Sequence, residues 1–181
     1  MVRDGKQVND SSVIISELMA GMKDQNVDTE ISKWLEFADR KLAVLLFPNI
    51  TRNFMESWEA FGYINEVPHF SGSQKLGLRI AGSLAMRLAN SKIKKKYAIE
   101  DERIALLDAI KTWTKEGLKG RNFHGGDDKP DLADVCMYGC LKSIEKFKTF
   151  AWLLDEADKE LLIWYNRMAA EIGESSCVSR E

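Results

Sequence analysis

Residues 123–134 read FHGGDDKPDLAD and are the most specific segment of this sequence. Two adjacent glycines and a proline are typical of a tight loop, and Asp131 stands where a helix would begin. Asp134 follows three residues later, where its carboxylate can accept a hydrogen bond from the backbone amide of Asp131. Because capping accounts for both acids, we interpret Asp131 and Asp134 as a structural capping box rather than as a carboxylate pair for acid–base catalysis.

Apolar residues on both sides of this loop recur at helical spacing. The stripe from Ile31 to Leu45 predicts a helix over residues 28–47, which Pro48-Asn49 should end. Other helices are predicted over 52–62 and 73–95, and from starts near Asp101, at Asp131 and just before Leu161. The chain has only three prolines, which leaves long stretches uninterrupted. We therefore expect an all-α fold.

The predicted helix over residues 73–95 is apolar on more than one side. Such a helix is usually buried between others, and we expect this one to be buried as well. Its apolar positions are Leu76, Leu78, Ile80, Ala81, Leu84, Ala85 and Leu88. Lysines cluster where it ends, at 92 and 94–96, and a solvated helix end is favoured there over a phosphate or membrane contact.

Composition excludes several classes of protein. The 181 residues are 45% hydrophobic and 30% charged, enough for a packed core. A net charge of -2 argues against a non-specific nucleic-acid binder. Arg79, Ser83 and Arg87 interrupt the longest apolar run, so no transmembrane span is expected. Three cysteines without a secretory signal predict a cytoplasmic protein as written, or an organellar or membrane-associated one if an upstream segment exists.

The sequence offers no convincing metal ligands or catalytic nucleophile. Cys136 and Cys140 lie on the apolar stripe of a predicted helix, where they are expected to be small buried hydrophobes. Together with the histidines, His69 and His124, they do not form a recognised zinc spacing. Cys177 has no base nearby in sequence.

Several aromatic residues allow two interpretations. Trp58 and Trp164, together with Tyr63 and Tyr165, are either core residues or the lining of a cleft for a flat apolar ligand. Their spacing does not decide between these possibilities.

The first residues do not fit a helical body. Asp4-Gly5 is a hairpin-turn dipeptide, and Gln7-Val8-Asn9 could be the short strand that leaves it. This segment is either a flexible arm or the last piece of a sheet domain whose front is absent. We divide the chain into such a remnant at 1–24, a helical domain at 25–173 and a tail at 174–181.

Asp10-Ser11-Ser12 precedes the apolar run Val13-Ile14-Ile15. Asp10 is a suitable N-cap for an ordinary helix. The same helix start could hold an amino-acid-like ligand end, because its free amides and a serine hydroxyl can donate to a carboxylate while Asp10 receives an ammonium group. Local sequence favours the ordinary cap and leaves both possibilities open.

These residues carry a resemblance to a known family. The stretch from Gly125 to Gly139 resembles the capping-box helix at the centre of the glutathione S-transferase C-terminal domain. More narrowly, the chain from about Gly5 onwards is similar to the plant-type prostaglandin E synthase 2 family. The supporting stretches are 9–15 (NDSSVII), 47–53 (FPNITRN), 94–97 (KKKY), 101–103 (DER) and 164–168 (WYNRM).

The resemblance implies a glutathione-binding protein. Family members join a thioredoxin-like domain to a helical one, form dimers, and isomerise prostaglandin H2 to prostaglandin E2. In the family, the pair matching Asp10 and Ser11 contacts glutathione. The reactive Cys-x-x-Cys of the family lies in the thioredoxin-like part, and this sequence contains none. Tyr97 stands about where animal members carry a histidine near the haem edge, so the resemblance gives little support to haem.

We therefore expect this chain to be the helical portion of a glutathione-dependent isomerase or transferase, and we expect this portion to be inactive alone. Its expected partners are glutathione, an apolar small-molecule substrate and a second copy of the chain. Two alternatives remain. The chain could be a non-catalytic interaction or scaffold domain of the glutathione S-transferase C-terminal type, or it could be a truncated gene product of the full enzyme.

Overall fold

The computed structural model describes residues 2–3, 6–7 and 29–173, and the chain divides into two units, 1–33 and 34–181. In the first unit, β1 (Val2–Arg3) pairs antiparallel with β2 (Lys6–Gln7), with Val2 opposite Gln7. Asp10, Ser11 and the tail 174–181 lie outside the described residues.

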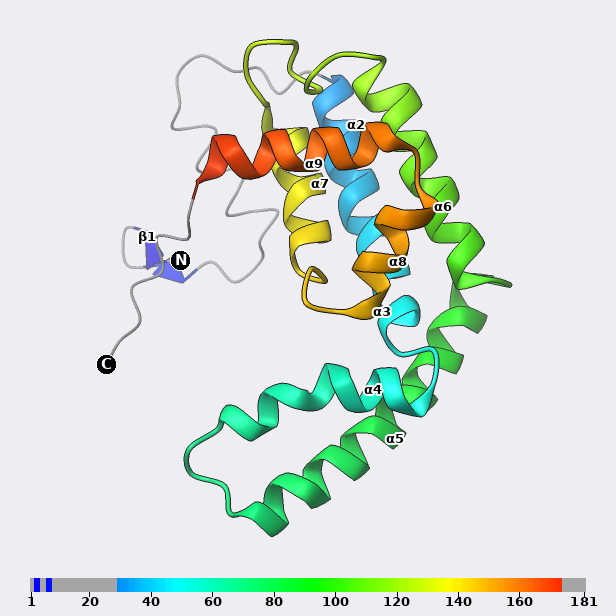
Figure 1. Cartoon of the computed structure of the whole chain (residues 1–181), viewed down its shortest axis with the longest axis vertical. Coiled ribbons are helices and arrows are strands. Elements are labelled where there is room, and N and C mark those ends of the chain that lie inside the picture. The colour runs from blue at the N-terminus through cyan, green and yellow to red at the C-terminus, as the bar shows by residue number, and fades with distance from the viewer. Residues whose placement is uncertain (1, 4–5, 8–28, 174–181) are drawn as a thin grey trace. The chain divides into compact units, whose positions relative to one another are not determined.

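Over residues 29–173 the regular structure is helical, which confirms the all-α prediction (Figure 1). Helix α2 (Thr29–Phe37) crosses the boundary between the two units. The elements that follow are π-helical η1 (Ala38–Leu42), α3 (Ala43–Ile50), α4 (Phe54–Ala60), 3-10 helix η2 (Phe61–Glu66), α5 (Gly72–Lys96), α6 (Glu102–Thr112), π-helical η3 (Trp113–Leu118), α7 (Leu132–Lys142), α8 (Lys148–Glu156) and α9 (Lys159–Ile172).

The first long helix does not end at Pro48 as predicted. Helices α2, η1 and α3 follow one another directly, and Pro48 lies inside α3, which ends at Ile50. Side chains near this end supply donors to backbone carbonyls. The Asn49 amide donates to Leu45 O at 2.9 Å, and the Thr51 hydroxyl donates to Phe47 O at 2.7 Å. These bonds stabilise the last turn around Pro48, whose ring nitrogen cannot donate to the carbonyl four residues earlier.

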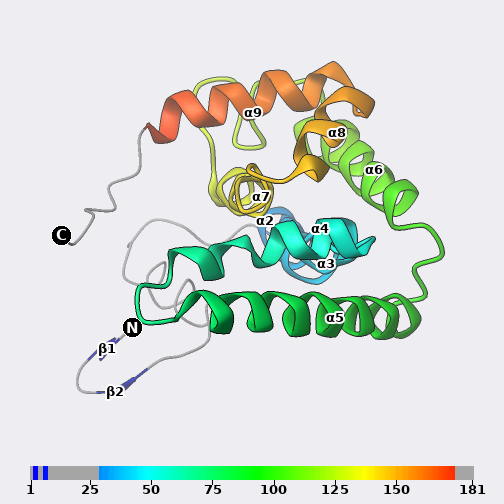
Figure 2. The same ribbon diagram turned by 60° about the horizontal axis from the view of Figure 1, so that its bottom comes forward.

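The core of the second unit is built around α7, which packs between η1 and α9 (Figures 1 and 2). Three tryptophans, Trp34, Trp113 and Trp164, are fully buried there and meet edge to face, with ring centroids 5.1 and 5.3 Å apart. Aromatic side chains of this size contribute a large share of the apolar area removed from water. The predicted stripes of α2, α6, α7 and α9 thus converge on one core.

Helix α5 is not buried between other helices, contrary to the prediction. It pairs with α4 and η2 along one side, as both views show, and uses polar or small side chains there (Figures 1 and 2). The Arg79 guanidinium donates to Trp58 O at 2.9 Å, and Gly82 leaves room for the Phe61 ring. Because the inward side is polar and small, the leucine side faces outward. No described helix, α5 included, is suited in length and apolar character to traverse a bilayer.

Candidate functional site

The loop at 123–131 and the start of α7 form a reciprocal set of hydrogen bonds. The Asp131 side chain accepts from the amides of Ala133 at 2.8 Å and of Asp134 at 3.2 Å. In return, Asp134 Oδ2 accepts from the amide of Asp131 at 3.0 Å. This is the geometry of a capping box, in which two free amides of a helix start are satisfied by side chains.

Asp134 does more than cap its helix. Its Oδ1 accepts from the His124 amide at 2.9 Å and from the Trp164 indole at 2.8 Å. Its Oδ2 accepts from the amides of Asp131 and of Gly125, the latter at 3.2 Å. The side chain is fully buried, and two carboxylate oxygens offer about four acceptor sites. These partners leave no open acceptor site for a ligand, which favours a structural role for Asp134.

His124 joins this network in a way that sequence reasoning missed. Its buried ring stacks on Trp113, and its Nδ1 lies 2.6 Å from Asp131 Oδ2. The other ring nitrogen, Nε2, is buried without a hydrogen-bond partner in the structure. Within residues 29–173, no cluster of acids, cysteines and histidines is suited to hold a metal ion. The sequence signal for this closely packed loop is Gly125. A Cβ at that position would stand 2.7 Å from Lys129 O, so the loop has room only for glycine there.

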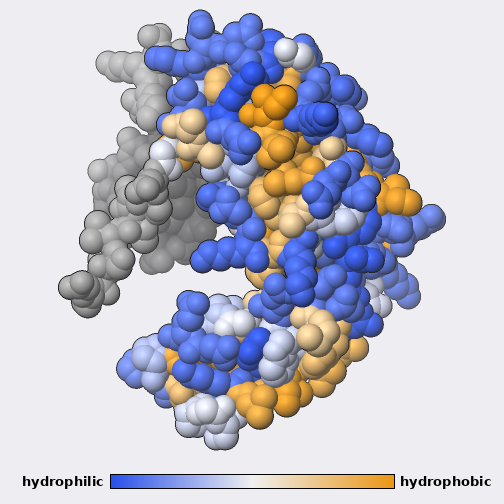
Figure 3. Space-filling model, viewed as in Figure 1, coloured by the Kyte–Doolittle hydropathy of each residue, from blue (hydrophilic) through white to orange (hydrophobic). Residues whose placement is uncertain are grey.

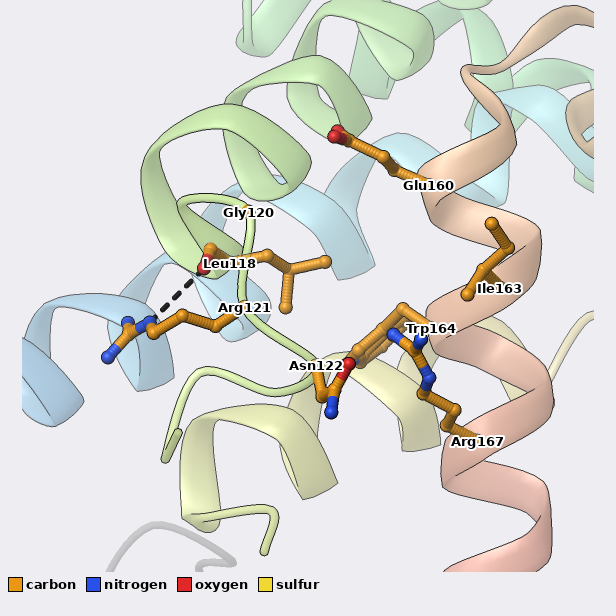
Figure 4. A pocket seen from close by; sticks show the side chains of 8 residues that line it. All are labelled: Leu118, Gly120, Arg121, Asn122, Glu160, Ile163, Trp164 and Arg167. Carbon is orange, nitrogen blue, oxygen red and sulfur yellow. Dashed lines mark hydrogen bonds between the residues drawn. The ribbon is translucent and has the colours of Figure 1, made fainter. Parts of the chain in front are cut away.

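A small pocket opens beside the network, between the segment that follows η3 and helix α9 (Figure 4). Its volume is about 160 Å³, below the roughly 300–1,000 Å³ typical of small-molecule sites. The lining residues are Leu118, Gly120, Arg121, Asn122, Glu160, Ile163, Trp164 and Arg167. The pocket alone is therefore too small for a large apolar substrate.

Trp164 links the pocket to the buried network. Its ring lines the pocket while its indole N–H is held by Asp134. Opposite it, the Asn122 side-chain amide donates to Asp127 O at 3.0 Å. The Arg121 guanidinium is directed to backbone carbonyls, including Leu118 O at 3.2 Å (Figure 4). Hydrogen bonds thus hold three of the lining side chains, and the bond from Trp164 to Asp134 connects the pocket to the capped helix.

The four aromatic residues proposed as a cleft occupy two separate environments. Trp58 packs on Phe54, and the Arg79 guanidinium lies 4.1 Å from its ring centroid. Trp164 and Tyr165 are buried in the core, and Tyr165 packs on Tyr138 with ring centroids 4.9 Å apart. Tyr63 is exposed and lies beside Phe61. No contact in the described structure brings Trp58 to Trp164, so the four residues do not line one cleft. Both residues of α9 belong to the core, and Trp164 also lines the small pocket.

The described cysteines are poor nucleophiles. Both are half-buried on α7, and burial raises the pKa of the Cys136 thiol. Burial also raises the pKa of Cys140 to about 11, with a smaller contribution from neighbouring Cys136. Since the thiolate is the reactive form, neither residue would attack a substrate readily near neutral pH. Cys177 lies outside the described residues, as do Asp10 and Ser11, whose glutathione role stays a prediction.

Comparison with known proteins identifies relatives of this chain. No protein-family profile matches it. It is 32% identical over 151 residues to prostaglandin E synthase 2 of Mus musculus, covering 83% of this chain and 38% of the relative. It is 30% identical over 137 residues to prostaglandin E synthase 2 of Danio rerio, covering 75% and 36%. The chain therefore spans less than two fifths of the length of these relatives, and the similarities support a relationship to the prostaglandin E synthase 2 family.

Proposed function

We propose that this chain is the helical portion of a glutathione-dependent isomerase or transferase of the prostaglandin E synthase 2 kind. The observation that carries the proposal is the similarity over 151 residues to a protein of that name. The all-α architecture is consistent with a helical domain of the glutathione S-transferase C-terminal type. The resemblance implies conversion of prostaglandin H2 to prostaglandin E2 as the reaction of the whole protein.

In this proposal, the chain binds and positions ligands and does not supply the reactive group. The thiols on α7 are held in their protonated form by burial. The reactive thiol would belong to a thioredoxin-like partner half, so the chain is inactive alone. Asp10 and Ser11 would contact the amino-acid end of glutathione, the acid receiving its ammonium group and the hydroxyl donating to its carboxylate.

Retention on immobilised glutathione tests this role. We expect the full chain to be retained and to elute with free glutathione, and we expect Ser11→Ala to weaken retention because a donor to the carboxylate is lost. Ser12→Ala is the matched control, since it removes a neighbouring hydroxyl and should leave retention unchanged. If the unaltered chain flows through, Asp10 and Ser11 are only a helix cap.

A non-catalytic interaction domain is the second candidate. The exposed leucines of α5 favour it, because large apolar side chains such as Leu84 and Leu88 remain outside the core. The two candidates differ in what they require of Ser11. An interaction domain would tolerate Ser11→Ala without loss, whereas a glutathione-binding chain would not.

A further inference from the structure

The outward side of α5 is a continuous apolar surface, which we call the leucine face. It consists of Leu76, Ile80, Leu84 and Leu88, spaced every four residues, and orange atoms mark it along the lower edge of Figure 3. Leu84 is 53% exposed and Leu88 is 69% exposed. Side chains four apart lie on one side of a helix, so these residues form a single surface about four turns long.

Charges hardly interrupt the leucine face. Arg87 lies beside it, but its guanidinium donates to the backbone carbonyl of Arg52. Gly77, Ala81 and Ala85 are the small neighbours of the leucines in sequence. An amphipathic helix of a globular domain normally turns its apolar stripe inward, so α5 has the reverse orientation.

The charge of α5 is strongly one-sided. The helix contains seven lysines and arginines and no aspartate or glutamate. Some of these cations are engaged within the protein: Lys75 donates to Asn65 O at 2.8 Å, and Lys94 pairs with Glu102. Lys92, Lys95 and Lys96 are exposed at the end of the helix and form no ion pair with another described residue. Lys96 lies over the Tyr97 ring, with its Nζ 5.0 Å from the ring centroid.

An apolar face next to exposed lysines complements a surface that is both apolar and negatively charged. We propose that α5 docks on an anionic lipid bilayer, with the leucine face entering the headgroup region and Lys92, Lys95 and Lys96 contacting acidic headgroups. The helix lies along the surface and does not cross it. A second copy of the chain fits less well, because two α5 helices would bring like charges together with no acid on either helix to compensate.

Exposed aromatic residues flank the same helix. Phe70 comes just before its N-cap and Tyr97 follows its last residue, and both side chains are exposed. Aromatic side chains are favoured at the boundary between water and lipid, where an apolar ring and a polar environment coexist. Both ends of α5 are therefore consistent with an interfacial position.

Co-sedimentation of the full chain with vesicles tests the proposal. Vesicles of phosphatidylcholine alone are compared with vesicles that contain about 30% phosphatidylserine, at low salt and in about 0.5 M NaCl. We expect binding to the phosphatidylserine vesicles only, reduced at least about tenfold by high salt. Leu84→Gln with Leu88→Gln, and separately Lys92→Gln with Lys95→Gln and Lys96→Gln, should each lower binding at least about tenfold.

Ile104→Gln is the matched control, because it removes an exposed apolar side chain from α6 and should leave vesicle binding unchanged. Circular dichroism of each variant verifies that it is folded. The proposal is overturned if the chain ignores anionic vesicles, binds neutral ones equally, or binds as before without the leucines. Sedimentation velocity supplies the last outcome: if the leucine substitutions instead abolish a dimer, the face belongs to a second copy and the proposal is wrong.

Discussion

Replacement of Asp134 by alanine removes the acceptor of four hydrogen bonds at once. Their donors are the amides of His124, Gly125 and Asp131 and the indole of Trp164. A lost helix cap alone costs about 1 kcal/mol. Two of the donors, the His124 amide and the Trp164 indole, are fully buried, and each of these left without a partner costs a further ~1–3 kcal/mol, less where the loop relaxes and admits water. We therefore expect Asp134→Ala to lower the free energy of unfolding by about 3–5 kcal/mol.

Urea unfolding followed by tryptophan fluorescence measures this loss, because Trp113 and Trp164 are buried beside the network. Asp134→Asn keeps the shape but turns one acceptor atom into a donor that faces other donors, so an intermediate loss is expected. Asp128→Ala is the control: this exposed acid lies in the same loop and should change stability by less than about 0.5 kcal/mol. If Asp134→Ala is no more destabilising than Asp128→Ala, the buried network does not stabilise the fold as described.

Three further predictions concern other parts of the structure. Gly82→Ala should destabilise the pairing of α4 with α5 because the new Cβ would collide with the Phe61 ring. Gly77→Ala meets only open space and should raise stability by about 0.5–1 kcal/mol. Thermal unfolding that ranks the two variants the other way would contradict the packing of α5. Cys140 should be alkylated slowly at neutral pH in a Cys136→Ala and Cys177→Ser background, which leaves it as the one thiol. Its rate should rise towards a pKa of about 11, and a midpoint near 8.5 would show an exposed thiol. Burial raises the pKa of Glu102, but hydrogen bonds from a lysine and an arginine outweigh burial and lower the pKa below 4.5, so the contribution of Glu102 to stability is present above that pH and lost as the pH falls. Glu102→Gln should therefore make stability less dependent on pH in the acid range. An unchanged acid range in this variant would contradict the ion pairs.

Local patterns predicted a large part of this fold. The capping positions Asp131 and Asp134 are three residues apart, so sequence spacing alone is enough to suggest their hydrogen bonds. Helical periodicity located the apolar stripes that form the core around Trp34 and Trp164, because burial on one side of a helix leaves a regular pattern.

What the sequence did not predict depends on contacts between distant segments. The leucines of α5 were expected to be buried, but whether a helix is covered on two sides depends on the number of neighbouring layers, which periodicity does not encode. Likewise, Pro48 was expected to end its helix, but α3 continues to Ile50 through a turn in which the side chains of Asn49 and Thr51 add hydrogen bonds. The indole of Trp164 reaches Asp134 across thirty positions of sequence, beyond any local pattern.

We propose that this chain contributes a glutathione site to a larger enzyme. Calorimetric titration measures glutathione binding to the chain extended through a thioredoxin-like half. We predict saturable binding that Asp10→Ala and Ser11→Ala each weaken by about tenfold, while Ser12→Ala leaves the affinity unchanged. Absence of binding, or an affinity that neither Asp10→Ala nor Ser11→Ala alters, would show that these two residues form no glutathione site.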